Sequence, residues 1–138
     1  MPTDTPIKNN YWVTYFVVLI LIATMSVLRY HSLHSTVYDM GLFINNIYMI
    51  SEGYWERLFL SHIQPFGVFW SLFYKVLPTD SVPVFILVGQ ASLLTIPIIG
   101  LYRFYGLLPA IAFLLYFPLW YNALFDFHID HLAVPLLF

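Results

Sequence analysis

The residues of this chain that could take part in chemistry are gathered into two short tracts. All five histidines and seven of the twelve Lys, Arg, Asp and Glu residues lie within residues 29–64 and 126–131. The rest of the chain is almost entirely apolar. Polar groups beside long apolar runs are costly in a membrane protein, so they tend to mark a functional site. The sequence therefore raises the question of whether the two tracts lie at the same membrane face.

The second tract reads Phe-Asp-Phe-His-Ile-Asp-His over residues 125–131. On a helix, at about 100° per residue, Asp126 and Asp130 lie on one stripe, and His128 and His131 lie on a neighbouring stripe. Carboxylates with imidazoles can coordinate a divalent cation, or they can position an acid and a base. A simpler interpretation is that Asp126 caps the next helix while the histidines sit at the headgroup boundary.

In the first tract, the carboxylate of Asp39 has either a structural or a catalytic role. Thr36 and Asp39 match the capping-box spacing that opens a helix, and Asp39 is also a candidate catalytic carboxylate at the membrane surface. Arg29 and Arg57 can bind phosphate through a bidentate fork, or they can simply contact lipid headgroups. His62, which enters the next apolar stretch, is a third candidate for binding a cofactor or substrate group.

Composition indicates an integral membrane protein. Of the 138 residues, 61% are hydrophobic and 9% are charged, whereas a soluble domain averages about 25% charged residues. The absence of cysteine excludes a disulfide framework, a thiolate nucleophile and a zinc–thiolate site. A net charge of -2 gives no basic surface for nucleic acid.

Apolar runs predict about three transmembrane helices and the start of a fourth. Residues 11–28, 82–101 and 107–124 are each long enough to cross a hydrocarbon core of about 30 Å. At the second of these helices we expect Ser81 as the N-cap, Pro83 in the first turn and Arg103 just after the end, followed by a tight turn at residues 103–106. We also expect a kink at Pro118, and a hydrogen bond from Gln90 to a neighbouring helix. A new apolar run begins at Leu132, so we expect the chain to be the N-terminal part of a longer bundle.

Two further segments are expected to lie in the membrane interface as part of the first outer loop. Residues 36–50 place apolar side chains at helical spacing between polar ones, and residues 66–77 form an apolar stretch of roughly 12 residues, too short for a span. The predicted fold class is therefore all-α integral membrane, with one membrane domain over residues 1–138.

The topology depends on the segment Phe66–Leu77. If it does not cross, the two polar tracts share one face of the membrane. If it crosses, they lie on opposite faces and cannot form a joint site. The non-crossing layout places Arg29, Arg57 and Lys75 on the extracytoplasmic side, against the usual bias of positive charge. Segment length favours this layout, so we expect a multi-pass protein of the cell membrane with its polar loops outside.

The order of motifs resembles an uncharacterised family of prokaryotic multi-span proteins, domain-of-unknown-function family 2079. The matching residues are Arg29, Tyr38-Asp39-Met40-Gly41-Leu42-Phe43, Gly53, His62-x-x-Pro65, Phe125-Asp126-Phe127-His128-x-Asp130 and Pro135. The resemblance covers nearly the whole chain from Arg29 onward, and Phe-Asp-Phe-His is its most specific part. The chain departs from the family at Asn46 and Tyr48, where Gln and Trp are expected nearby.

That family is in turn distantly similar to the GT-C membrane glycosyltransferases. The resemblance implies an outward-facing active site that uses a polyprenyl-phosphate sugar, with Asp39 as general base or metal-linked carboxylate. It also implies that Asp126, His128 and Asp130 help to bind Mg or Mn, or phosphate. The remaining helices would come from a longer chain or a partner subunit.

Two alternatives to an enzyme stay open from the sequence. One is a non-enzymatic membrane protein, such as a component of a metal or solute carrier, whose histidines bind a transition metal. The other is an inactive truncated product.

Overall fold

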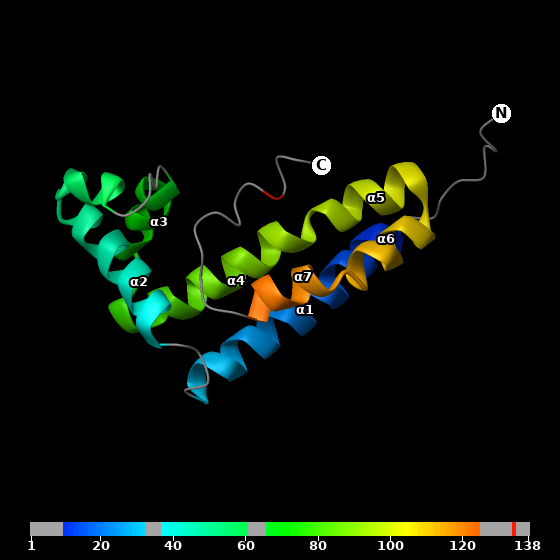
Figure 1. Cartoon of the computed structure of the whole chain (residues 1–138), viewed down its shortest axis with the longest axis horizontal. Coiled ribbons are helices and arrows are strands. Elements are labelled where there is room, and N and C mark those ends of the chain that lie inside the picture. The colour runs from blue at the N-terminus through cyan, green and yellow to red at the C-terminus, as the bar shows by residue number, and fades with distance from the viewer. Residues whose placement is uncertain (1–9, 33–36, 61–65, 125–133, 135–138) are drawn as a thin grey trace.

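The computed structural model describes residues 10–32, 37–60, 66–124 and 134 (Figure 1). All regular secondary structure within these ranges is helical, which confirms the predicted all-α class. The α-helices are α1 (Asn10–His31), α2 (Val37–Ser51), α3 (Phe66–Tyr74), α4 (Val82–Thr95), α5 (Pro97–Tyr105), α6 (Leu107–Leu114) and α7 (Phe117–Leu124). Two short 3₁₀ helices, η1 (Trp55–Phe59) and η2 (Thr79–Ser81), precede α3 and α4.

Among the residues that the structure describes, two stretches are long and apolar enough to cross a membrane. A third stretch qualifies if a bent pair of helices is counted as one span. Helix α1 has 22 residues and is therefore about 33 Å long. Residues Thr79–Tyr105 form a second stretch of 27 residues, made of η2, α4 and α5. Helices α6 and α7 form the bent pair, with an angle of 53° between them. The chain has the character of a multi-pass membrane protein.

The long helices extend beyond the apolar runs that predicted them. Helix α1 continues to His31, and α5 continues to Tyr105, so that Arg103 lies in the last turn of α5 and not in a loop after it. The chain then reverses at Gly106, whose φ of 92° is readily adopted only by glycine. This single residue makes the tight turn that we expected at residues 103–106.

Ser81 occupies the N-cap position of α4, as predicted, but its side chain makes no capping hydrogen bond there. Its hydroxyl instead donates to the Pro78 carbonyl, at 2.7 Å, and stabilises the preceding 3₁₀ turn. Pro83 lies in the first turn of α4, as expected.

The membrane-length helices lie side by side (Figure 1). Helix α1 packs along α4 and α5 and also contacts α7, while α6 runs back along α5. Buried side chains from five helices form one core here: Val18, Ile22, Ala91, Leu94, Ile98, Ala110, Leu119 and Ala123. The outer surfaces of these helices are also apolar. Examples are Val17 and Ile20 of α1 and Leu108 of α6, which are well exposed, as expected where lipid is the solvent.

Helices α2 and α3 pack against each other at one end of this bundle, beside the start of α4 (Figure 1). Helix α3 has nine residues, about 13 Å, which is far less than a hydrocarbon core of about 30 Å. Its Trp70 is only 2% exposed and belongs to a second core, formed with Met40, Phe43, Ile47, Val82, Ile86 and Leu87. Packing against α4 therefore holds α3 at the end of the bundle.

Candidate functional site

The end of the bundle where α1 finishes and where α4 begins is called here the polar end. Helix α7 runs toward this end and finishes level with Ser26 of α1 and Gln90 of α4. Helix α2 lies at the same end (Figure 1), and the 3₁₀ helices η1 and η2 contact α2 and α4, respectively. Arg103 and Gly106 mark the opposite end. The described charged residues other than Arg103 therefore gather at the polar end: Arg29, Glu52, Glu56, Arg57, Lys75 and Asp80.

The C-terminus of α7 is fixed by side chains from two neighbouring helices. The last four carbonyl groups of any α-helix lack a partner within the helix. The Ser26 hydroxyl of α1 donates to the Ala123 carbonyl at 2.7 Å, and the Gln90 amide of α4 donates to the Asn122 carbonyl at 3.2 Å. Both side chains are buried. The expected bond from Gln90 to a neighbouring helix is confirmed.

These two hydrogen bonds place the end of α7 close to the end of α1. Ser26 lies three residues before Arg29, which is a rise of about 4.5 Å along α1. The tract 125–131 follows Leu124, the last residue of α7, directly in the sequence. Ser26 lies inside the apolar run 11–28, and no partner was predicted for it from the sequence. A serine inside such a run can form a hydrogen bond to another helix, so its position was the one sequence feature that could have indicated this contact.

The two candidate phosphate-binding arginines sit on separate elements of the polar end. Arg29 lies in the last turn of α1 and is half-buried. Arg57 is also half-buried and lies on η1, which packs against α2. Their positions would allow each guanidinium to face an anionic group at the membrane surface.

The other predicted site residues lie outside the described part of the structure. This applies to His62, Asp126, His128 and Asp130, and to the side chain of Asp39, whose backbone belongs to α2. Within the described ranges, no three His, Asp or Glu side chains are grouped closely enough to hold a metal ion. The metal-binding role expected for residues 126–130 stays a prediction.

Three tyrosines of α1, α2 and α3 were not predicted to be site residues. Tyr48 of α2 and Tyr74 of α3 have ring centroids 5.6 Å apart, and Tyr74 and Tyr30 of α1 both pack against the core that contains Trp70. Burial raises the pKa of Tyr74 to about 12, and electrostatic interaction with Tyr30 contributes further. The Tyr74 hydroxyl is therefore a neutral hydrogen-bonding group at physiological pH. Tyrosine commonly occupies the headgroup level of a membrane.

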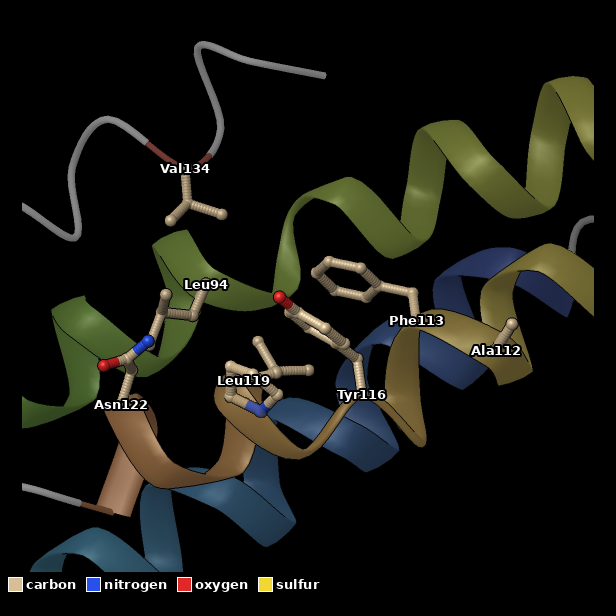
Figure 2. A pocket seen from close by; sticks show the side chains of 8 residues that line it. Leu94, Ala112, Phe113, Tyr116, Leu119, Asn122 and Val134 are labelled. Carbon is tan, nitrogen blue, oxygen red and sulfur yellow. The ribbon is translucent and has the colours of Figure 1, made fainter.

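The bend between α6 and α7 follows from Pro118, as the sequence predicted. Proline has no amide proton, so the Leu114 carbonyl four residues earlier loses its helical hydrogen bond. The indole N–H of Trp120 donates to this carbonyl instead. A cavity of about 410 Å³ opens beside the bend, and the side chains that line it are shown in Figure 2.

Comparison with known proteins adds no relative from which a role could be transferred. No family model, no curated protein and no solved structure matches this chain.

Proposed function

We propose that this chain acts in an integral membrane glycosyltransferase that takes a polyprenyl-phosphate sugar as donor and works at the polar end of the bundle. One observation supports the proposal more than any other. The hydrogen bond from Ser26 to Ala123 holds the end of α7 beside the end of α1. The segment after α7 and the segment after α1 therefore leave the bundle at the same end, as a site shared by the two polar tracts would require.

The chemistry of the proposed reaction matches the residue types available. An acceptor hydroxyl must lose a proton while the phosphate of the leaving group gains negative charge. In this proposal Asp39 takes the proton, and Arg29 and Arg57 bind the phosphate oxygens. Helix α2, which carries Asp39, contacts η1, which carries Arg57.

A divalent cation is also part of the proposal. The two carboxylates of Asp126 and Asp130 with the imidazole of His128 form a donor set that suits Mg²⁺ or Mn²⁺. When bound, such a cation would neutralise phosphate charge. His62 is proposed to contact the donor from the segment between η1 and α3.

The decisive test is sugar transfer from a polyprenyl-phosphate donor by membranes that contain the full-length protein. Asp39→Asn should abolish transfer while the amount of protein in the membrane stays unchanged. Asp80→Asn is the matched control, because Asp80 is an exposed carboxylate at the same end, and it should retain transfer. Transfer retained by Asp39→Asn would reject Asp39 as the base. Transfer absent from the wild-type protein across a panel of polyprenyl-phosphate sugars would reject the proposed activity.

A further inference from the structure

The cavity beside the bend lies within the membrane-spanning part of the bundle, not at the polar end. Its volume is about 410 Å³, within the range of about 300–1,000 Å³ that is typical of small-ligand sites. Helices α4, α6 and α7 and the residue Val134 contribute its walls (Figure 2). The lining residues are Leu94, Ala112, Phe113, Tyr116, Pro118, Leu119, Asn122 and Val134.

The cavity lies at the break between α6 and α7, and its wall on α4 is Leu94, two residues before a second interruption. The α6–α7 pair breaks at Leu115 and Tyr116, and the α4–α5 stretch is interrupted at Ile96, before Pro97. Proline at each break leaves a carbonyl four residues earlier without its helical donor. Irregular backbone at membrane depth is found where protein buries it or where it borders a cavity. The cavity therefore borders irregular backbone at the α6–α7 break.

The walls of the cavity select an apolar occupant. Only Tyr116 and Asn122, among the described lining residues, carry polar side-chain atoms. A buried water needs two to four polar partners, so water is poorly held across most of this space. If the cavity were empty, the side chains that line it would lose dispersion contacts. A hydrocarbon chain from the surrounding lipid would restore these contacts and needs no hydrogen-bond partners.

The rim shows how a hydrocarbon chain would enter. Tyr116 is 59% exposed, and its neighbours Leu115 and Phe117 are 77% and 72% exposed. The break between α6 and α7 is thus open on its outer side, where these apolar side chains meet lipid. A chain could enter sideways from the bilayer without passing through water.

The polar atoms at one end of the cavity indicate which lipid fits. Asn122, two residues before the end of α7, lines the end of the cavity that is nearer the polar end, while Ala112 and Phe113 line the other end (Figure 2). The ester carbonyl of a phospholipid lies at the boundary between headgroups and hydrocarbon, where an Asn amide can donate to it. A polyprenyl phosphate offers no such carbonyl.

We propose that this cavity binds one acyl chain of a membrane phospholipid, with its ester carbonyl at Asn122 and its methyl end toward Phe113. This inference does not depend on the proposed transferase activity. It predicts a lipid held in a defined orientation between the two broken helices, distinct from the lipid that surrounds the outer faces of α1 and α6.

Photolabelling of the full chain in phosphatidylcholine vesicles tests the proposal. A trace of phosphatidylcholine with a diazirine at the end of one acyl chain should label Phe113 more strongly than Val17 and Ile20 on the exposed face of α1. A second probe, with the diazirine beside the ester, should label Asn122 instead. Equal labelling of the cavity and the α1 face, or the reverse order of the two probes, would overturn the proposal.

Filling the cavity provides the matched comparison. Ala112→Trp adds an indole to the cavity wall and should abolish labelling of Phe113. Leu108→Trp makes a similar change one turn earlier on α6, at a residue that is 78% exposed and outside the cavity, and should leave labelling intact. Helix content measured by circular dichroism checks both variants, and Ala112→Leu replaces Ala112→Trp if the latter fails to fold. Labelling that survives cavity filling would reject the site. Loss of labelling on adding a small fraction of polyprenyl phosphate would show an isoprenoid occupant and reject the phospholipid.

Discussion

Gly89 allows the close approach of α3 to α4, and its replacement by alanine tests this contact directly. A Cβ atom added at Gly89 would overlap the indole of Trp70, with the Cζ3 atom 3.0 Å away and another ring atom closer still. Trp70 is 2% exposed and is surrounded by the core shared by α2, α3 and α4. The ring therefore cannot move aside without disturbing that core.

Two opposing effects determine how much Gly89→Ala changes the free energy of unfolding. An extra methyl group in a packed core typically costs about 1–3 kcal/mol, because neighbouring side chains or backbone must shift. Replacing a helical glycine with alanine gains roughly 0.5–1 kcal/mol of helix stability. For Gly89→Ala the overlap is with a rigid buried ring, so the first effect dominates. We expect a net loss of about 1–2 kcal/mol in the free energy of unfolding.

Gly100→Ala is the matched control on the same membrane-length stretch. A Cβ at Gly100 meets nothing within 4 Å, so this variant keeps the gain in helix stability without the overlap. Unfolding of the purified protein in mixed micelles, titrated with a denaturing detergent and followed by circular dichroism, would measure both. Gly89→Ala should unfold at lower detergent fraction than the wild type, and Gly100→Ala at equal or higher fraction.

A double-mutant cycle tests whether contact with Trp70 causes the loss of stability in Gly89→Ala. Trp70→Leu should be destabilising alone, but adding Gly89→Ala to it should cost little, with a coupling energy of about 1 kcal/mol or more between the two sites. If Gly89→Ala stabilises the protein as much as Gly100→Ala does, Trp70 does not pack on Gly89. The conclusion that packing against α4 holds α3 at the end of the bundle would then be wrong.

Three further changes test the bend and the polar end. Gln90→Leu should lower the free energy of unfolding by about 0.5–1.5 kcal/mol, because the Asn122 carbonyl loses its donor; the same detergent titration measures this, and an unchanged midpoint would contradict it. Pro118→Ala restores a donor for the Leu114 carbonyl and should reduce the 53° bend, seen as a longer distance between spin labels at positions 111 and 121; an unchanged distance would show that the bend has another cause. Below pH 10 Tyr74 is protonated in both states, but between pH 10 and about 12 only the unfolded chain releases its proton. Stability should therefore fall with rising pH in this window, and Tyr74→Phe should make the fall shallower; an unaltered pH profile would show that Tyr74 is not buried.

The helices were largely predictable because each depends on a local property of the sequence. Long apolar runs, a glycine at the reversal and proline at the bend indicate α1, the α4–α5 stretch and the α6–α7 pair from residue types alone. The extent of α5 was not predictable in this way. Arg103 looked like the end of a span, but the helix continues through it to Tyr105, since a cation near a helix C-terminus is favourable and does not stop the helix.

The contacts between helices were less predictable than the helices. The sequence indicated that Gln90 would bond to a neighbour but not that the acceptor would be the Asn122 carbonyl, and Ser26 gave no sign of its partner on α7. The cavity is lined by Leu94 of α4 and by Tyr116 at the α6–α7 break, which lie 22 residues apart in the sequence and come together only after the chain reverses. Such features arise from packing, which spacing along one chain does not determine.

The position of α7 depends on polar bonds more than on its apolar surface. In a bilayer, lipid contacts apolar side chains about as well as another helix does, so burial alone hardly resists sliding of one helix along another. Ser26, Gln90 and Trp120 each donate to a carbonyl of α6 or α7 that has no helical donor. Sliding α7 by one turn would break the bonds from Ser26 and Gln90 together, at a cost of about 0.5–1.5 kcal/mol each. These bonds therefore define where α7 ends, and so the point at the polar end from which the tract of Asp126 and His128 departs.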